Sequence, residues 1–145
     1  MPAPEHQPES ATFSLVNARA DIERAEGQLL GAMERMGYSE ASRFALRLAV
    51  EEGLVNAFRH GHKDLPPQTP VAFAYTVTPA EVTLDIEDQG PGFKPAEVRD
   101  PTLEENLELP TGRGLLLIRA YMTSVEYNAK GNRVRMTYSR PSPTA

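Results

Sequence analysis

The chain has 145 residues, 40% of them apolar, which fits a single domain built around one hydrophobic core. Its 15 Lys and Arg against 20 Asp and Glu give a net charge of −5. This balance argues against direct nucleic-acid binding or an anionic membrane surface, since both need clustered positive charge. There is no cysteine, so disulfides, thiolate nucleophiles and Cys-ligated metal sites are excluded. The sequence shows neither an apolar run of spanning length nor a signal peptide, so we expect a soluble, cytoplasmic protein.

The first half of the chain predicts a strand followed by two helices. Residues 11–17 alternate polar and apolar side chains, which is typical of a short strand. Between residues 18 and 36, apolar side chains recur at steps of three and four and predict a helix: Ile22, Ala25, Leu29, Ala32, Met33 and Met36. Gly37 follows as a helix C′ residue would, and Ser39 is the expected N-cap of a second helix that runs to about residue 60.

The second half predicts four strands and one short helix. The strands are expected at residues 71–78, 82–87, 124–128 and 133–139, and the helix at 114–122. Residues 78–81 and 130–132 have the composition of hairpin turns. Residues 88–112 show no sustained period, and a segment of this length without structure of its own is usually functional or disordered.

The order of these elements predicts an α+β fold. We expect a two-layer sandwich, with helices on one face of a mixed, mostly antiparallel sheet. Residues 1–10 and 140–145 contain several prolines and few apolar side chains, so they bury too little surface to offset the entropy of ordering. The domain is therefore expected to span residues 11–139 between two disordered ends.

The second helix carries polar residues within an otherwise apolar run. Glu52, Asn56 and His60 follow one another at four-residue steps and lie along one narrow stripe. A second polar stripe, about 100° away, is expected to be solvated and to hold an Arg47–Glu51 ion pair. Glu52 either meets a partner, a metal or solvent in a cleft, or it sits at the helix edge with a hydrogen bond to a loop amide.

Two glycine motifs add further candidates, each open to a simpler explanation. Asp88, Gly90 and Gly92 follow a strand, where they form either a turn that needs positive φ or a fixed carboxylate beside a backbone that a flat ligand can approach. The segment TGRGLLLI, residues 111–118, opens a helix with two glycines. It is either a hinge without a ligand or an anion site, because free N–H groups and the helix dipole favour phosphate there.

Taken in chain order, these motifs resemble the N, G1 and G2 boxes of the GHKL superfamily of ATPases, whose members include gyrase, MutL and histidine kinases. Within that superfamily the segments LAVEEGLVNAFRHG, LDIEDQGPGF and LPTGRGLLLIRAYMTSVEYNAKGNRVRM are similar to the stand-alone anti-sigma-factor serine/threonine kinases of RsbW type. The resemblance covers about residues 13–138 and implies the Bergerat ATP-binding fold of histidine-kinase-like ATPases.

The resemblance implies ATP and Mg²⁺ as ligands and assigns roles to three residues. Asn56 corresponds to the residue that coordinates Mg²⁺ together with the nucleotide phosphates. Glu52 corresponds to the general base that accepts the proton of a Ser or Thr hydroxyl, while the neighbouring Glu51 lies on the other stripe. Asp88 corresponds to the residue that binds the exocyclic amine of adenine. Residues from about 93 to 111 correspond to the ATP lid.

The glycine motifs receive supporting roles from the same resemblance. Gly90 and Gly92 are expected to form the turn beside the base. The phosphates are expected to bind at the second glycine motif, with Arg113 as a hypothetical contact of the γ-phosphate: Gly112, Arg113, Gly114 and Leu115. His60 is expected to be structural, as a cap of the helix end or a support for Asn56. Gly53 stands where the family usually has a small residue such as Ala. This glycine either lets the nucleotide approach or indicates altered nucleotide binding.

The function that this resemblance implies is an anti-sigma factor and protein kinase. It would sequester a sigma factor and phosphorylate a STAS-domain anti-anti-sigma protein on Ser or Thr, and family likeness implies a homodimer. Two alternatives stay open, namely a module that binds nucleotide without turnover and a small ATPase in which Glu52 activates water. A histidine kinase fits least well, because the chain has no room for a dimerising helical hairpin with a phosphoacceptor His.

Overall fold

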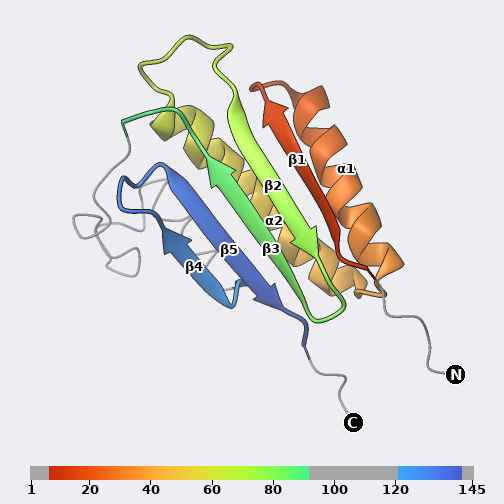
Figure 1. Cartoon of the computed structure of the whole chain (residues 1–145). Coiled ribbons are helices and arrows are strands. Elements are labelled where there is room, and N and C mark those ends of the chain that lie inside the picture. The colour runs from red at the N-terminus through yellow and green to blue at the C-terminus, as the bar shows by residue number, and fades with distance from the viewer. Residues whose placement is uncertain (1–6, 92–120, 142–145) are drawn as a thin grey trace, which may run out of the picture.

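The computed structural model describes residues 7–91 and 121–141 of the chain (Figure 1). The elements in chain order are β1 (Glu9–Leu15), α1 (Arg19–Arg35), α2 (Glu40–Asn56), the π-helical segment η1 (Ala57–Gly61), β2 (Val71–Val77), β3 (Glu81–Glu87), β4 (Ser124–Tyr127) and β5 (Arg133–Ser139). Within these two ranges, no helix is long and apolar enough to cross a membrane.

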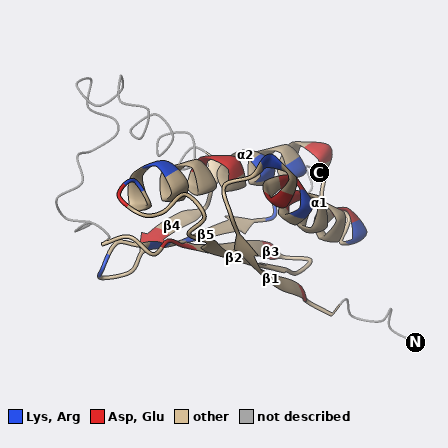
Figure 2. Ribbon diagram, turned by 90° about the horizontal axis from the view of Figure 1, so that it is seen from above, with Lys and Arg blue, Asp and Glu red and all other residues tan. Residues whose placement is uncertain are grey.

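The five strands form one open sheet in the order β1-β2-β3-β5-β4. Every neighbouring pair is antiparallel, so the sheet that the described strands form has no parallel pair. Figure 2 shows α1 and α2 together on one face of this sheet, and in Figure 1 α1 lies along β1 while α2 crosses behind β2 and β3. The predicted α+β sandwich with helices on one face is confirmed.

The core lies between the helices and the covered face of the sheet. Alternate residues of each central strand point into it, so that β3 buries Val82, Leu84 and Ile86. All six apolar residues that predicted the first helix are buried. The periods of two and of 3.6 residues in the sequence therefore correspond to the two layers that meet in this core.

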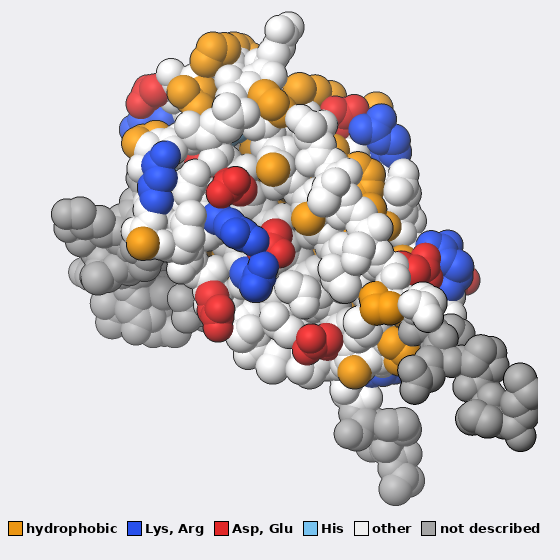
Figure 3. Space-filling view, in the orientation of Figure 1, with side chains coloured by type: hydrophobic (Ala, Val, Ile, Leu, Met, Phe, Trp, Pro, Cys, Tyr) orange, Lys and Arg blue, Asp and Glu red, His pale blue; other side chains and the backbone are white. Residues whose placement is uncertain are grey.

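The opposite face of the sheet carries no helix from the described part of the chain. Figure 3 shows that face, where charged side chains gather over β3, β5 and β4, while the area over β1 and β2 is mostly neutral. On these strands, Asp85 Oδ1 of β3 accepts hydrogen bonds from Arg133 Nη2 (3.0 Å) and Arg135 Nε (3.1 Å) of β5.

The predicted helix ends between α1 and α2 are confirmed by their caps. Gly37 has φ of 80°, and the N–H of Tyr38 donates to the carbonyl oxygen of Met33 at 3.0 Å, which closes α1 with a Schellman motif. Ser39 Oγ accepts a hydrogen bond from the N–H of Ser42 at 3.1 Å and caps α2.

Both predicted hairpin turns are also present. The N–H of Thr78 donates to the carbonyl oxygen of Glu81 at 2.9 Å and closes the β2–β3 turn. In the β4–β5 turn Gly131 has φ of 80°, and Asn128 Oδ1 accepts hydrogen bonds from three successive amides, those of Gly131, Asn132 and Arg133.

The ends of the ordered domain differ from the predicted ones. β1 begins at Glu9, two residues earlier than predicted, and ends at Leu15. The C-terminal tail was predicted to start at residue 140, but Arg140 is anchored: its guanidinium donates to the carbonyl oxygens of Met36 (2.9 Å) and Gly37 (2.5 Å) and lies 4.6 Å from the ring centroid of Tyr38. These partners are distant in sequence, so local composition gave no sign of them. The ordered domain therefore includes Arg140.

Helix α2 is shorter than predicted, because the α-helix ends at Asn56 and continues as the π-helical segment η1. The N–H of His62 donates to the carbonyl oxygen of Ala57 at 3.0 Å, which is the five-residue step of a π-helix. Most of the segment predicted at 88–112 and of the helix predicted at 114–122 lies outside the described residues.

Candidate active site

Gly53 marks the side of α2 that faces the sheet. A Cβ atom on Gly53 would lie 2.5 Å from Ile86 Cδ1 of β3 and 3.3 Å from Met136 Cε of β5. A residue with a side chain would therefore push α2 away from the sheet or displace Ile86. The interpretation that Gly53 gives room to a nucleotide is wrong, because the space beside it is filled by the core.

Glu52 and Asn56 lie on the flank of α2 that points away from α1. At about 100° per residue, they lie roughly 100° and 60° to one side of Gly53, whereas Glu51 lies roughly 160° to the other side. Glu51 contacts Arg19 of α1, with Oε1 2.6 Å from Nη2, which fixes the side on which α1 lies. In Figure 1 α1 stands at the β1 end of the sheet, so the flank of Glu52 and Asn56 faces the half that contains β5 and β4.

The second polar stripe of α2 is partly exposed, with 57% of the Arg47 side chain and 28% of the Glu51 side chain accessible, but its charges pair with α1. Arg19 of α1 makes a bidentate ion pair with Glu51, at 3.0 and 2.6 Å. Arg47 Nε lies 3.8 Å from Glu26 Oε2 of α1, so the predicted Arg47–Glu51 pair is replaced by pairs between helices. We call Arg19, Glu26, Arg47 and Glu51 the interhelical charge cluster.

Glu26 is the buried member of this cluster, with 4% of its side chain exposed. Burial, followed by a hydrogen bond and charge repulsion from Glu51, raises the pKa of Glu26 to about 7. The hydrogen bond from Arg19 lowers the pKa of Glu51. Glu26 Oε1 has no hydrogen-bond partner among the described residues. The sequence signal for Glu26 was its place four residues after Ile22, on the buried side of α1.

Glu52 and Asn56 have no side-chain hydrogen bond to any residue within 7–91 or 121–141. Both side chains are partly buried at the helix flank. Within these ranges no loop amide caps Glu52, so the helix-edge alternative has no support there. A carboxylate and an amide oxygen one turn apart are thus left with hydrogen-bonding capacity for other groups.

Asp88 sits directly after β3 in a turn that is tied to the β4–β5 hairpin. The N–H of Asp88 donates to the carbonyl oxygen of Asn132 (2.8 Å), and Asn132 Nδ2 donates to the carbonyl oxygen of Asp88 (2.9 Å). The carboxylate oxygen Oδ1 accepts the N–H of Gly90 at 2.8 Å. Oδ2 accepts no hydrogen bond from the described residues, so it has accepting capacity left for another donor.

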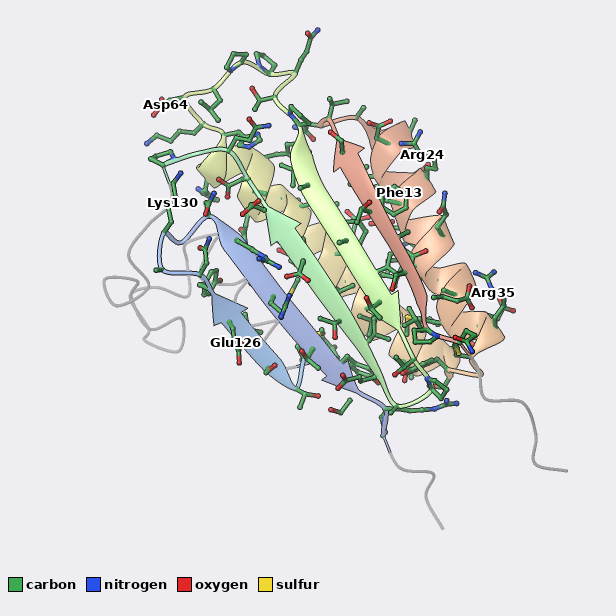
Figure 4. All side chains as sticks on the ribbon, in the orientation of Figure 1. Phe13, Arg24, Arg35, Asp64, Glu126 and Lys130 are labelled. Carbon is green, nitrogen blue, oxygen red and sulfur yellow. The ribbon has the colours of Figure 1, made fainter. Side chains whose placement is uncertain are left out.

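The surroundings of the Asp88 carboxyl group act on its pKa in opposite directions. Burial raises the pKa of Asp88, and the Gly90 hydrogen bond acts in the other direction. The charge of Lys130, in the β4–β5 turn, also favours the ionised carboxylate. Figure 4 labels Lys130 and Asp64 at the same end of the sheet, so two connections bring charged groups to this end.

The end of η1 packs directly against the Asp88 turn. A Cβ atom on Gly61 would overlap the Asp88 carboxyl group, and one on Gly90 would overlap the carbonyl group of Gly61. Gly90 does not have positive φ, so close backbone approach explains this glycine better than turn conformation does. Asn56 is the last residue of α2 and η1 follows it directly, so the end of the α2 flank and the Asp88 turn are neighbours.

His62 is a residue of this region that the sequence analysis missed. It is 7% exposed, and its Nε2 accepts the N–H of Gln89, at 2.8 Å, in the turn after Asp88. The predicted structural histidine, His60, is exposed, and the π-helical turn shifts it from the line through Asn56. The available signal for His62 was its position immediately after the glycine that ends the helix.

The remaining predicted site residues lie outside the described ranges. They are Gly92, Gly112, Arg113, Gly114 and Leu115. Their roles at the turn and at the phosphates stay predictions. Of the predicted site, the structure brings together Glu52 and Asn56 on one helix flank, and Asp88 and Gly90 at the end of that helix.

Residues 16–138 match the family described as the histidine kinase-like ATPase domain. The chain belongs to this family. It is 33% identical over 97 residues to serine/threonine-protein kinase BtrW of Bordetella bronchiseptica, over 64% of this chain and 66% of that protein. It is 29% identical over 106 residues to serine-protein kinase RsbW of Oceanobacillus iheyensis, over 69% of this chain and 66% of that protein. The matches thus span just under two thirds of the length of each relative.

The chain is thus a member of the histidine kinase-like ATPase domain family and is similar to two proteins named as serine or serine/threonine kinases. The donor set of this region fits ATP and Mg²⁺: Asn56 offers one hard oxygen ligand, and Asp88 Oδ2 offers an acceptor to an amine. The described residues contain no group of three or more His, Asp or Glu that could hold a metal ion by themselves. Magnesium held jointly by one amide and by phosphates is compatible with such a surface.

Proposed function

We propose that this protein is an ATP-dependent serine/threonine protein kinase and anti-sigma factor. It sequesters a sigma factor and phosphorylates a STAS-domain anti-anti-sigma protein on Ser or Thr. The observation that carries the proposal is the contrast on α2, where Glu51 is held in the interhelical charge cluster and Glu52, with Asn56, faces the other flank with no described hydrogen bond. Membership in the ATPase family and the two kinase-named relatives support it.

Glu52 acts as the general base in this proposal. Its carboxylate accepts the proton of the Ser or Thr hydroxyl as that oxygen forms a bond to the γ-phosphorus atom. The bond between the γ-phosphorus and the β,γ-bridging oxygen breaks, and ADP leaves with the electron pair. Glu52 has the exposure that this task needs, because it is partly buried and still accessible.

Asn56 and Asp88 hold the nucleotide. Asn56 provides one ligand to Mg²⁺, which neutralises phosphate charge when it is bound. Asp88 Oδ2 accepts a hydrogen bond from the exocyclic amine of adenine, which favours ATP over GTP, while Oδ1 stays bonded to Gly90. Gly92 completes the turn, and the segment from Gly112 to Leu115, including Arg113, contacts the phosphates.

The regulatory part of the proposal concerns partners. Sigma factor and STAS protein each prefer one nucleotide or phosphorylation state of the system, so that phosphoryl transfer switches the partner. The protein acts as a cytoplasmic homodimer and contacts neither nucleic acid nor membrane. Its net charge of −5 is compatible with a basic surface on the sigma factor.

One assay separates this function from its two alternatives. The protein is incubated with γ-³²P-labelled ATP, Mg²⁺ and each STAS-domain protein of the same genome. Label on a STAS Ser or Thr, lost in Glu52→Gln, supports the kinase. Tight nucleotide binding without transfer identifies a binding module, and release of phosphate without any partner identifies an ATPase. Either of these two results contradicts the proposal.

A further inference from the structure

The turn after β3 is held at three successive backbone amides by three different acceptors. The N–H of Asp88 donates to the carbonyl oxygen of Asn132, and the N–H of Gly90 donates to Asp88 itself. Between them, the N–H of Gln89 donates to Nε2 of His62 at 2.8 Å. The middle amide is thus the one that ties the turn to the segment after α2 through a side chain.

The imidazole of His62 is fixed in place by its own surroundings. The residue is 7% exposed, and its ring meets the ring of Phe58 edge-on, with the centroids 5.9 Å apart at 82°. Its backbone closes η1 through the hydrogen bond to Ala57 and accepts the N–H of Leu65 at 3.0 Å. The acceptor Nε2 therefore belongs to a buried residue whose backbone N–H and C=O are both hydrogen-bonded. Such an acceptor fixes the position of its donor, the amide of Gln89.

The hydrogen bond also defines the state of the ring. Nε2 accepts, so the imidazole is neutral and carries its proton on Nδ1. Without this acceptor, the amide of Gln89 would lose its partner in a half-buried turn, and the turn would rearrange to satisfy it. Because Asp88 Oδ1 is bonded to Gly90 one residue further on, any rotation of the turn also moves Oδ2.

We propose that His62 is a positioning residue that sets the selectivity for adenine by fixing the orientation of the Asp88 carboxylate. The inference rests on the proposed function, in which Asp88 Oδ2 accepts the amine of adenine. His62 donates nothing to the base itself; it contacts the amide of Gln89 and acts on the base through the turn. Its loss therefore weakens recognition of the amine more than it weakens binding of the rest of the nucleotide.

The test compares two variants, each of which keeps one property of the histidine side chain. His62→Phe keeps a ring beside Phe58 but removes the acceptor, whereas His62→Gln keeps an acceptor oxygen near the place of Nε2. Affinities for Mg-ADP and Mg-IDP are measured by calorimetry, because the base of IDP lacks the exocyclic amine. Lys63→Gln, at the exposed neighbouring residue, is the matched control, and thermal unfolding checks that each variant folds.

We expect the wild-type protein and Lys63→Gln to prefer ADP over IDP. In His62→Phe the affinity for ADP falls about five- to tenfold while that for IDP stays nearly unchanged, and His62→Gln restores most of the preference. An unchanged ADP-to-IDP ratio in His62→Phe overturns the inference and leaves the proposed function standing, as does a His62→Gln variant no better than His62→Phe. A wild-type protein that binds no ADP overturns both.

A measurement on the wild-type protein keeps the inference testable if His62→Phe does not fold. Nitrogen NMR of ¹⁵N-labelled protein distinguishes the two ring nitrogens of the neutral imidazole. The expected signature is an unprotonated Nε2 with the proton on Nδ1, coupled to the amide of Gln89. A proton on Nε2 overturns the inference, because that atom then cannot accept.

Discussion

Glu51 and Glu52 are adjacent on one helix, but within the described residues only the Glu51 carboxylate is paired with a cation. Glu51 points to α1, where Arg19 holds both of its oxygens and lowers its pKa. Glu52 points to the other flank, next to Asn56, and makes no hydrogen bond to the described part of the chain. A carboxylate that is saturated by a guanidinium stabilises the contact of two helices, whereas an unsaturated one is available to accept a proton.

The comparison also explains why the sequence alone did not separate the two residues fully. The four-residue step from Glu52 to Asn56 placed both on one stripe, and the resemblance to the kinase family assigned Glu52 the role of general base. That Glu51 binds another helix could not be predicted, because Arg19 is 32 residues away in the chain. Because Arg19 binds both oxygens of Glu51, Glu52 is the carboxylate of the two that is available to accept a proton, which supports its choice as the base.

The largest expected effect is that of Glu52→Gln on phosphoryl transfer. We expect the rate of transfer to a STAS protein to fall by about 10²–10⁴-fold, because the amide cannot accept the hydroxyl proton. The free energy of unfolding should change little, since no described hydrogen bond is lost. The matched control is Glu51→Gln, which should keep its transfer rate within about twofold and lose about 1 kcal/mol of stability. The reverse pattern would show that the two roles have been exchanged.

The next effect is that of Asp88→Asn on nucleotide affinity. The amide oxygen can still accept the N–H of Gly90, but an NH₂ group then meets the amine of adenine. We expect the affinity for ADP to fall by about 10- to 100-fold, as measured by calorimetry, with the fold intact by circular dichroism. An Asp88→Asn variant that binds ADP as well as the wild-type protein would remove Asp88 from the base site.

The interhelical charge cluster predicts a pH dependence of stability. The pKa of Glu26 is about 7 in the folded protein against an ordinary 4.5. Between pH 4.5 and pH 7, Glu26 is therefore more protonated in the folded protein than in the unfolded chain. The contribution of Glu26 to the free energy of unfolding therefore falls as pH rises from 4.5 to 7, by about 3 kcal/mol, and is constant outside that window.

Glu26→Gln isolates this contribution. We expect the variant to be more stable than the wild-type protein at pH 8, because it places no buried charge beside Glu51, and the difference should shrink toward pH 5. Urea unfolding at a series of pH values measures it. A difference between the two proteins that does not vary with pH would show that Glu26 titrates as an ordinary carboxyl group.

The smallest effect concerns Gly53 and the packing of α2 on the sheet. We expect Gly53→Ala to destabilise by about 1 kcal/mol, since overpacking against Ile86 Cδ1 exceeds the gain in helix propensity. Ile86→Val deletes Cδ1, so the double variant should be more stable than the sum of the single changes predicts. A double-mutant cycle by urea unfolding checks this coupling, and additive effects would contradict the contact.

Local sequence patterns predicted most of the fold. The apolar periods, the caps at Gly37 and Ser39 and both hairpin turns reflect interactions among near neighbours, so the sequence contains their signal. The π-helical turn after Asn56, the anchoring of Arg140 and the packing at Gly53 depend on residues that are distant in the chain. Those features could not be predicted from one sequence.

The residues of the candidate site also fall into those with a signal in the local sequence and those without one. The N and G1 motifs supplied Glu52, Asn56 and Asp88 from spacing and residue type. The residue that ties the Asp88 turn to the end of α2, His62, was missed because a hydrogen bond to a backbone amide has no sequence pattern. Gly90 was expected either for positive φ or for the approach of a flat ligand, while the constraint that the structure shows is the neighbouring backbone of Gly61.

In the proposed function, the α2 flank and the Asp88 turn form one magnesium–nucleotide site. Calorimetric titration of ADP into the wild-type protein and Asn56→Ala, each with Mg²⁺ and with excess EDTA, tests it most directly. We expect one site per chain in the wild-type protein, weakened about tenfold or more by EDTA, and no effect of EDTA on any binding that remains in Asn56→Ala. An absence of heat with the wild-type protein, or an Asn56→Ala variant with unchanged magnesium dependence, would contradict the claim.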